Sequence, residues 1–105
     1  MKSNRIALIS VTKDKRPNKT SKYKAKFRIG ENKTEIVYFG GRGYRDYTMK
    51  STPDKTRLLY IGRHKKEDWT DPISRGTLSR YILWEYKGLN KAVKEYRNRF
   101  NLKSK

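Results

Sequence analysis

The residues best suited to chemistry in this sequence surround its single histidine. His64 is followed by Glu67 and Asp68 in the stretch YIGRHKKEDW, and a histidine beside carboxylates is typical of acid–base pairs and metal sites. The chain has no cysteine and no second histidine, and this spacing is no recognised ligand pattern, which disfavours a protein-only zinc site. We predict a structural histidine in a polar turn, and neither metal nor cofactor.

The tripeptide Tyr60-Ile61-Gly62 is half of the signature of the GIY-YIG nucleases. The GIY half is missing from the preceding strands, and a catalytic carboxylate could be assigned only by selecting Glu85 or Glu95 without further support. No Walker loop, dinucleotide fingerprint or paired-carboxylate motif is present, and no serine or threonine has a visible base. We therefore predict that the protein is not an enzyme and takes no small-molecule substrate.

Binding of a polyanion is the chemistry that the basic residues favour. In the stretch KYKAKFRI, cations alternate with apolar residues, so a strand there would carry four positive charges on one face. The last predicted helix adds a second basic face. The candidate binding residues are Lys22, Lys24, Lys26, Arg28, Lys91, Lys94 and Arg97. The alternative for the strand is a solvated face whose lysines discourage edge pairing.

The composition limits the partner and the compartment. The 105 residues carry a net charge of +18, spread over both halves, with 33% hydrophobic residues, which fits one domain with a small core. Such a chain needs an acidic partner: nucleic acid, an anionic membrane surface or an acidic protein face. The longest early apolar run, IALISV, is too short for a signal peptide or a membrane span, so we expect synthesis inside a cell without secretion.

The first half of the chain has the patterns of strands. Residues 5–11 form a β-branched apolar run, 22–29 alternate with period two, and 34–39 follow a short GENK loop as an antiparallel partner. Residues 12–21, rich in lysine and containing Pro17, read as a basic loop that is mobile unless a partner orders it.

The second half has the patterns of helices. Thr52-Pro53-Asp54 resembles a helix start, with Gly62 limiting the helix, although 58–62 could also form a strand. A second helix is predicted over 74–86, ended by Gly88, and a third from Leu89, whose apolar residues recur with helical period. The predicted fold is α+β: a small three-stranded antiparallel sheet followed by two or three helices, in one domain over 1–105 with a short basic tail at 101–105.

The stretch YFGGRGYRDYTM joins the two halves. It occurs once and follows a well-patterned strand, unlike repetitive arginine-glycine RNA-binding tails, so its glycines indicate a structural turn with positive φ or close chain approach. We expect the two tyrosines to pack against the sheet and the aspartate to cap, or to pair with Arg42 or Arg45. The predicted turn residues are Gly40, Gly41, Gly43, Tyr44, Asp46 and Tyr47. Aromatic residues such as Tyr44, Tyr47, Trp69 and Trp84 could stack on bases, but a chain poor in aliphatic residues needs its rings for the core.

Four blocks carry a family resemblance: GRGYRDYT, YIGRHKKEDW, GTLSRYILW and YRNRF. With these blocks in this order over residues 38–100, the chain resembles small basic proteins of uncharacterised function from the nucleocytoplasmic large DNA viruses, such as chlorella-virus and mimivirus relatives. It departs from them at Arg75-Gly76, where an alanine-glycine pair is expected. The family offers no catalytic residues to transfer.

The resemblance implies a virion component. Together with the charge, it leads us to expect a non-enzymatic minor capsid (cement) protein that binds acidic surfaces of neighbouring capsid proteins. Viral DNA and the inner membrane surface are the other polyanions of such a particle. The alternative is a basic nucleic-acid-binding protein that packages or condenses viral DNA.

Overall fold

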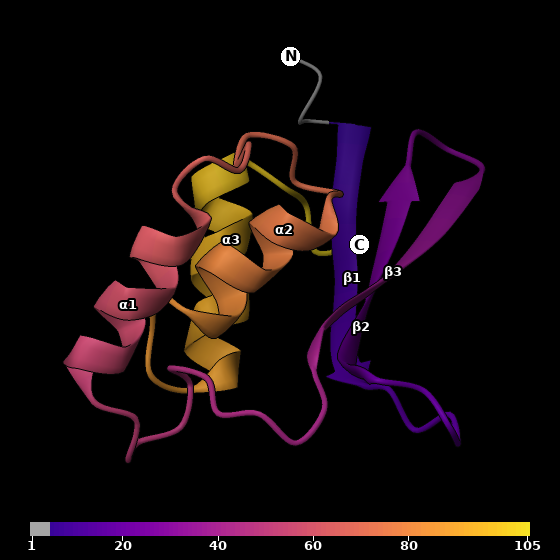
Figure 1. The fold of residues 1–105 in the computed structure, drawn as a ribbon. Coiled ribbons are helices and arrows are strands. Elements are labelled where there is room, and N and C mark those ends of the chain that lie inside the picture. The colour runs from indigo at the N-terminus through magenta and orange to yellow at the C-terminus, as the bar shows by residue number, and fades with distance from the viewer. Residues whose placement is uncertain (1–4) are drawn as a thin grey trace.

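Three strands followed by helices form the α+β fold that the sequence predicts. The computed structural model describes residues 5–105, in which β1 (Ile6–Lys13), β2 (Ser21–Ile29) and β3 (Lys33–Gly41) pair antiparallel in the order β1-β2-β3. The helices lie together on one side of the sheet (Figure 1), and no helix of the described part covers its other face.

The alternation in β2 places the sheet on the core. Ala25 and Phe27 are fully buried, whereas Lys24 and Lys26 are exposed on the opposite face. The outer strands extend further than their apolar runs, because main-chain pairing continues to Lys13 in β1 and to Gly41 in β3. The predicted basic loop is correspondingly shorter, since it begins after Lys13 and ends before β2.

The helices depart from the predictions at their ends. Residues 58–62 lie within α1 (Asp54–His64), so the alternative of a strand there is wrong, and Gly62 does not end the helix. Thr52 is not its N-cap: Pro53 holds that position, and the Thr52 hydroxyl donates to the carbonyl oxygen of Asp46 at 2.7 Å.

The second predicted helix is shorter than 74–86. It consists of α2 (Arg75–Leu78) and a π-helical turn, η2 (Ser79–Leu83), and Trp84 leaves helical geometry with φ −124° and ψ 22°. Gly88 does not end this helix. With φ of 85° it instead precedes α3 (Leu89–Phe100), the helix predicted from its periodicity.

The core fills the space between the sheet and the helices. Its buried residues come from all three strands, from α2, η2 and the residue after η2, and from α3 and the C-terminal segment: Leu8, Ala25, Phe27, Phe39, Leu78, Ile82, Leu83, Trp84, Ala92, Tyr96 and Leu102. Aromatic rings supply much of this volume, as the composition predicts. Tyr96 is fully buried, and its hydroxyl donates to the carbonyl oxygen of Pro72 at 2.7 Å.

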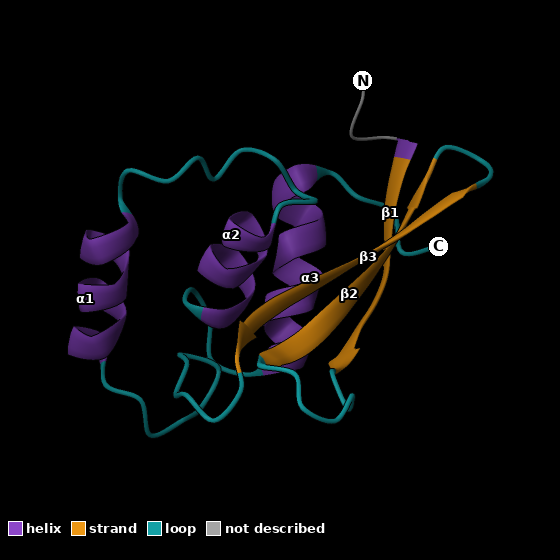
Figure 2. Cartoon of the chain, turned by 45° about the vertical axis from the view of Figure 1, so that its right-hand side comes forward, coloured by secondary structure: helices purple, strands orange, loops and turns teal. Residues whose placement is uncertain are grey.

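The C-terminal segment covers one edge of the sheet. The Lys103 amide donates to the Ile6 carbonyl at 3.1 Å, and the Leu8 amide donates to the Lys103 carbonyl at 2.8 Å. Leu102 is buried beside this pairing, so part of the predicted basic tail is packed (Figure 2). Between residues 5 and 105, no helix has the length and apolar character needed to span a membrane.

Candidate binding surfaces

The open sheet face presents cations that the fold does not use. Lys24 and Lys26 are exposed, and neither side chain makes a hydrogen bond or ion pair with any residue of the described chain. Their cross-strand neighbours are uncharged: Thr12 and Tyr38 beside Lys24, and Ser10 and Ile36 beside Lys26. The charge of this face is therefore not compensated from within.

Two basic hollows lie at the ends of this face. One, of about 650 Å³, is lined by Thr12, Lys13, Asp14, Lys15, Arg16, Lys24 and Tyr38. The other, of about 470 Å³, is lined by Arg5, Ala7, Arg28, Gly30, Glu31 and Lys103. The half-buried Arg28 thus belongs to the second hollow and continues the line of cations along β2.

Two of the predicted binding residues serve the fold instead. Lys22 Nζ lies 2.6 Å from Asp46 Oδ2, and the side chains are only 13% and 2% exposed. Arg97 donates from Nε and Nη2 to the Leu8 carbonyl oxygen at 2.9 and 2.8 Å, where the pairing register shifts in β1. These two charges are not available to a partner in the way that Lys24 and Lys26 are.

The predicted cations divide between two surfaces. Lys91 and Lys94 are exposed on the outer side of α3, whose inner side buries Ala92 and Tyr96 in the core. Because α3 packs on the covered side of the sheet (Figure 1), the core separates these lysines from the open sheet face. The strand and helix cations therefore do not form one continuous patch.

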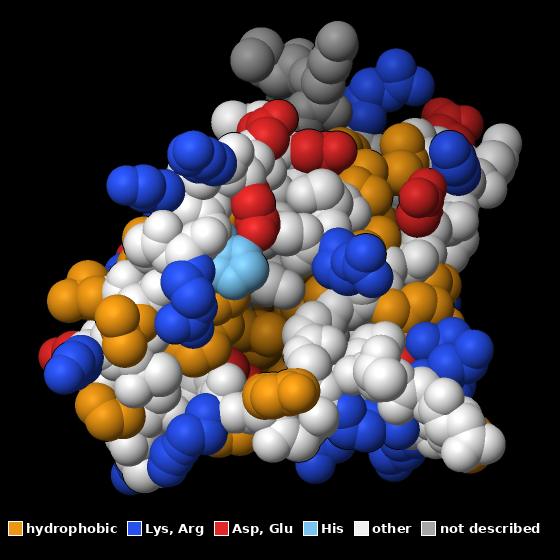
Figure 3. Space-filling view, in the orientation of Figure 1, with side chains coloured by type: hydrophobic (Ala, Val, Ile, Leu, Met, Phe, Trp, Pro, Cys, Tyr) orange, Lys and Arg blue, Asp and Glu red, His pale blue; other side chains and the backbone are white. Residues whose placement is uncertain are grey.

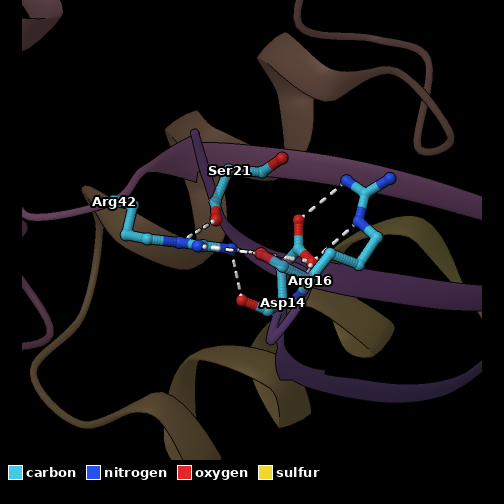
Figure 4. A network of polar contacts seen from close by, with 4 residues as sticks. All are labelled: Asp14, Arg16, Ser21 and Arg42. Carbon is cyan, nitrogen blue, oxygen red and sulfur yellow. Dashed lines mark hydrogen bonds and ion pairs between the residues drawn. The ribbon is translucent and has the colours of Figure 1, made fainter. Parts of the chain in front are cut away.

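The basic loop after β1 is held by an internal network (Figure 4). Arg16 binds the Asp14 carboxylate with two nitrogens, at 2.9 and 2.8 Å, and Arg42, directly after β3, reaches across to the loop. Arg42 donates to the Arg16 carbonyl at 3.0 Å, to the Ser21 carbonyl at 3.1 Å and to the Asp14 carbonyl. The loop is thus fixed by its own chain, contrary to the prediction that a partner must order it.

Two carboxylates, Asp14 in this network and Glu85 near the helices, are each bound by arginine side chains. The hydrogen bonds from Arg16 hold the pKa of Asp14 below its ordinary value, although burial opposes this. Glu85 accepts from Arg57 at 2.7 Å and from Arg80 at 2.6 Å; burial raises its pKa, but these hydrogen bonds outweigh burial and the net shift is downward. Asp14 and Glu85 therefore neutralise arginines of the fold, and Lys24 and Lys26 have no carboxylate partner in the described chain.

The glycine corner has the geometry predicted for a structural turn. Gly40 and Gly43 have φ of 81° and 86°, and a Cβ on Gly41 would lie 2.8 Å from the Tyr44 ring. The sequence predicts that Tyr44 packs against the sheet; its ring lies beside Gly41, the last residue of β3, but the side chain stays 75% exposed and is not part of the core.

The polar residues of the corner also differ from expectation. Asp46 pairs with Lys22 rather than with Arg42 or Arg45, and its Oδ1 accepts from the Thr48 amide at 2.9 Å, so only the expected capping role is present. Tyr47 is half-buried, and its amide donates to the Leu83 carbonyl at 2.7 Å, so Tyr47 is tied to η2, whereas Asp46 ties the corner to β2.

His64 belongs to a stack of rings rather than to a metal site. Its imidazole stacks on Tyr60 with 4.3 Å between centroids, Tyr60 stacks on Trp84 at 4.6 Å, and His64 Nδ1 contacts Glu67 Oε2. Asp68 turns away to accept from the Thr70 amide at 3.0 Å. No group of three or more potential metal ligands occurs among residues 5–105.

This stack borders the aromatic cleft, a hollow of about 530 Å³ between α1 and the sheet whose lining includes Tyr44, Arg45, Tyr60, His64, Arg75 and Trp84. Figure 3 shows the histidine at its rim, with apolar side chains deeper inside. The sequence had marked most of these residues singly. It could not place them together, since they come from the corner, α1, α2 and the segment after η2.

Comparison with known proteins does not supply a relative. Neither family models, nor curated proteins, nor solved structures match this chain. A function must therefore be argued from the open sheet face, the outer side of α3 and the aromatic cleft.

Proposed function

We propose that this chain is a non-enzymatic structural protein that binds the acidic surface of a neighbouring protein through its open sheet face, as a minor capsid (cement) protein of a large DNA virus. The observation that carries the proposal is the state of Lys24 and Lys26, which are exposed, flanked by uncharged residues and without partners in the described chain. An acidic partner would supply the carboxylates that these two lysines lack within the described chain.

The rest of the molecule supports a surface that is ready to dock. The Asp14–Arg16–Arg42 network fixes the loop beside Lys24, so little ordering is needed when a partner arrives. A preorganised surface loses less conformational entropy on binding than a mobile one. The viral context comes from the motif blocks over residues 38–100, which resemble those of large DNA virus proteins.

Nucleic acid is the second candidate, and the spacing of the strand cations favours it. Alternate residues of a strand lie about 6.5–7 Å apart, which is about twice the 3.4 Å axial spacing of phosphates along one DNA strand. Lys24, Lys26 and Arg28 follow this spacing on one face of β2. In this role the protein would package or condense viral DNA without sequence preference.

A pair of charge-matched variants tests whether the open sheet face binds. Lys24→Ser/Lys26→Ser removes two charges from the face, whereas Lys50→Ser/Lys55→Ser removes two exposed charges elsewhere. Binding to poly-glutamate and to duplex DNA is measured over a range of salt concentrations. We expect the first variant alone to weaken binding and to reduce the salt slope by about two for DNA. Equal losses of affinity in both variants would mean that binding depends only on the overall positive charge and not on the open sheet face.

The location of the chain in purified virions separates the two candidates. Particles are stripped into shell, membrane and DNA core, and the chain is quantified in each fraction by mass spectrometry. The capsid role predicts recovery with the shell at a fixed ratio to the major capsid protein. Recovery with the DNA core would overturn it in favour of packaging.

A further inference from the structure

We propose that the aromatic cleft is the anchor site for one aromatic side chain carried by an acidic segment of the partner protein. This inference rests on the proposed function, because it assumes an acidic protein partner. It adds a second contact of a different kind, in which an apolar group is buried and specificity is gained. The open sheet face supplies charge attraction alone.

The charged residues that line the cleft favour an acidic ligand. Its two carboxylates are already occupied, since Asp46 pairs with Lys22 at 2.6 Å and Glu67 contacts His64. Arg75 has an exposed side chain that pairs with no carboxylate in the described chain, and Arg45 donates only to the Ser51 hydroxyl, at 2.9 Å. The rim therefore offers two guanidinium groups suited to carboxylates of a bound segment.

The apolar residues inside the cleft favour an aromatic side chain as its ligand. Trp84 and Leu83 contribute apolar surface from the core at its base, and Tyr44 holds an exposed ring at its rim. The hollow of about 530 Å³ lies within the range of about 300–1,000 Å³ typical of ligand sites. One aromatic side chain and the adjoining backbone fit within such a volume.

Glycines allow side chains that line the cleft to pack closely against the backbone. Gly40 and Gly41 line the cleft on the sheet side, where side chains would collide with Leu83 and Tyr44 at 2.8 Å. On the helix side, a Cβ on Gly76 would lie 3.0 Å from Glu67 Oε1, so glycine there lets Glu67 approach α2 while it contacts His64. Larger residues at these three positions would displace Leu83, Tyr44 or Glu67, so the shape of the hollow depends on the glycines.

The arrangement of the rings favours a peptide over a nucleotide. Stacking of a base requires a free ring face, but both faces of Tyr60 are covered, by His64 and by Trp84. Only Tyr44 presents a widely exposed ring. Tyrosine, tryptophan and arginine gathered around one hollow are instead the residue types that dominate hot spots of protein interfaces.

Nuclear magnetic resonance of the labelled full chain tests this site. The ligand is a heptapeptide with phenylalanine at its centre and three glutamate or aspartate residues on each side, and the control peptide has alanine at the centre. We expect the amides of Gly40, Gly41 and Gly76 to shift on titration, with the phenylalanine peptide binding at least about tenfold more tightly than the alanine peptide.

Variants with exposed changes keep the fold and locate the contact. Tyr44→Ala and Arg75→Ser should each weaken the phenylalanine peptide by about three- to tenfold, while Arg63→Ser, an exposed arginine of α1 that is not among the lining residues, should have little effect. Tyr44→Ala should also reduce the preference for phenylalanine over alanine.

The outcomes separate this inference from the proposed function. Shifts confined to the amides around Lys24 and Lys26, with equal affinity for both peptides, would overturn the anchor site and leave the acidic-partner role standing. Shifts nowhere at low salt would overturn both. Cleft shifts that are stronger with adenosine monophosphate than with the phenylalanine peptide would overturn the peptide assignment in favour of a nucleotide site.

Discussion

Replacement of Lys22 by methionine should destabilise the protein strongly, even though the sequence groups Lys22 with the surface cations. The Lys22 ammonium lies 2.6 Å from an Asp46 carboxylate whose side chain is 2% exposed. Lys22→Met removes the charge and nearly keeps the volume, which leaves the buried carboxylate without its counter-ion. Breaking a buried pair in this way costs about 3–5 kcal/mol, a large part of the stability of a small domain.

Lys24→Met is the matched control, because it changes the same residue type on the same face of β2. Lys24 is exposed and without a partner in the described chain, so its replacement should change the unfolding free energy by less than about 0.5 kcal/mol. Both variants are unfolded in urea and followed by tryptophan fluorescence. An equal, small change in the two midpoints would refute the assignment of Lys22 to the fold.

A double variant separates the ion pair from other effects of the substitution. Asp46→Asn removes the negative charge and keeps an oxygen that can accept from the Thr48 amide, as Asp46 Oδ1 does at 2.9 Å. The loss in Lys22→Met/Asp46→Asn should therefore be smaller than the sum of the single losses, with a coupling energy of about 0.5–3 kcal/mol. Strict additivity would mean that the two side chains do not depend on each other.

Three further predictions follow from local geometry. Asp14→Asn should make the loop after β1 more sensitive to proteolysis. Because the folded state lowers the pKa of Asp14, its carboxylate stabilises the fold only above the pKa of the unfolded chain, so the loss of stability in Asp14→Asn should be constant above about pH 5 and shrink below about pH 4. A loss that grew in acid would contradict this. Gly40→Ala should lower the urea midpoint, since φ is 81° and a Cβ would clash at 2.8 Å with Leu83. Gly62→Ala, in open space within α1, should raise the unfolding free energy by about 0.5–1 kcal/mol. A Gly40→Ala variant more stable than Gly62→Ala would contradict both expectations. Tyr96→Phe should cost about 0.5–1.5 kcal/mol through its lost hydrogen bond, and a midpoint at or above wild type would refute that bond.

The elements that the sequence predicted best are those whose side chains alternate between core and solvent. In β2 the alternation of Ala25 and Phe27 with lysines has period two, and in α3 the buried Ala92 and Tyr96 follow the helical period. Helix α1 buries no residue completely, and its Leu58 and Leu59 are exposed. Its sequence therefore lacks the periodicity that separates a helix from a strand.

The candidate sites depend on contacts between distant residues, which local patterns do not encode. Lys22 reaches a carboxylate 24 positions away, and Arg97 reaches a carbonyl 89 positions away. Nothing within a few residues of either distinguishes it from Lys24 or Lys94. The aromatic cleft is out of reach of a local pattern for the same reason, because its rings come from three separate segments.

The net charge of +18 already counts internal ion pairs as neutral, but it does not show which cations a partner meets. Arginines bridge internal acceptors: Arg16 and Arg42 hold the loop, while Arg57 and Arg80 share Glu85. A planar guanidinium can satisfy two acceptors at once, whereas an ammonium is a compact, strongly hydrated charge. Lysines that have only uncharged cross-strand neighbours, Lys24 and Lys26, are left facing solvent. If binding follows this division, it should respond to the two exposed lysines far more than to any paired arginine, while stability should respond in the opposite order.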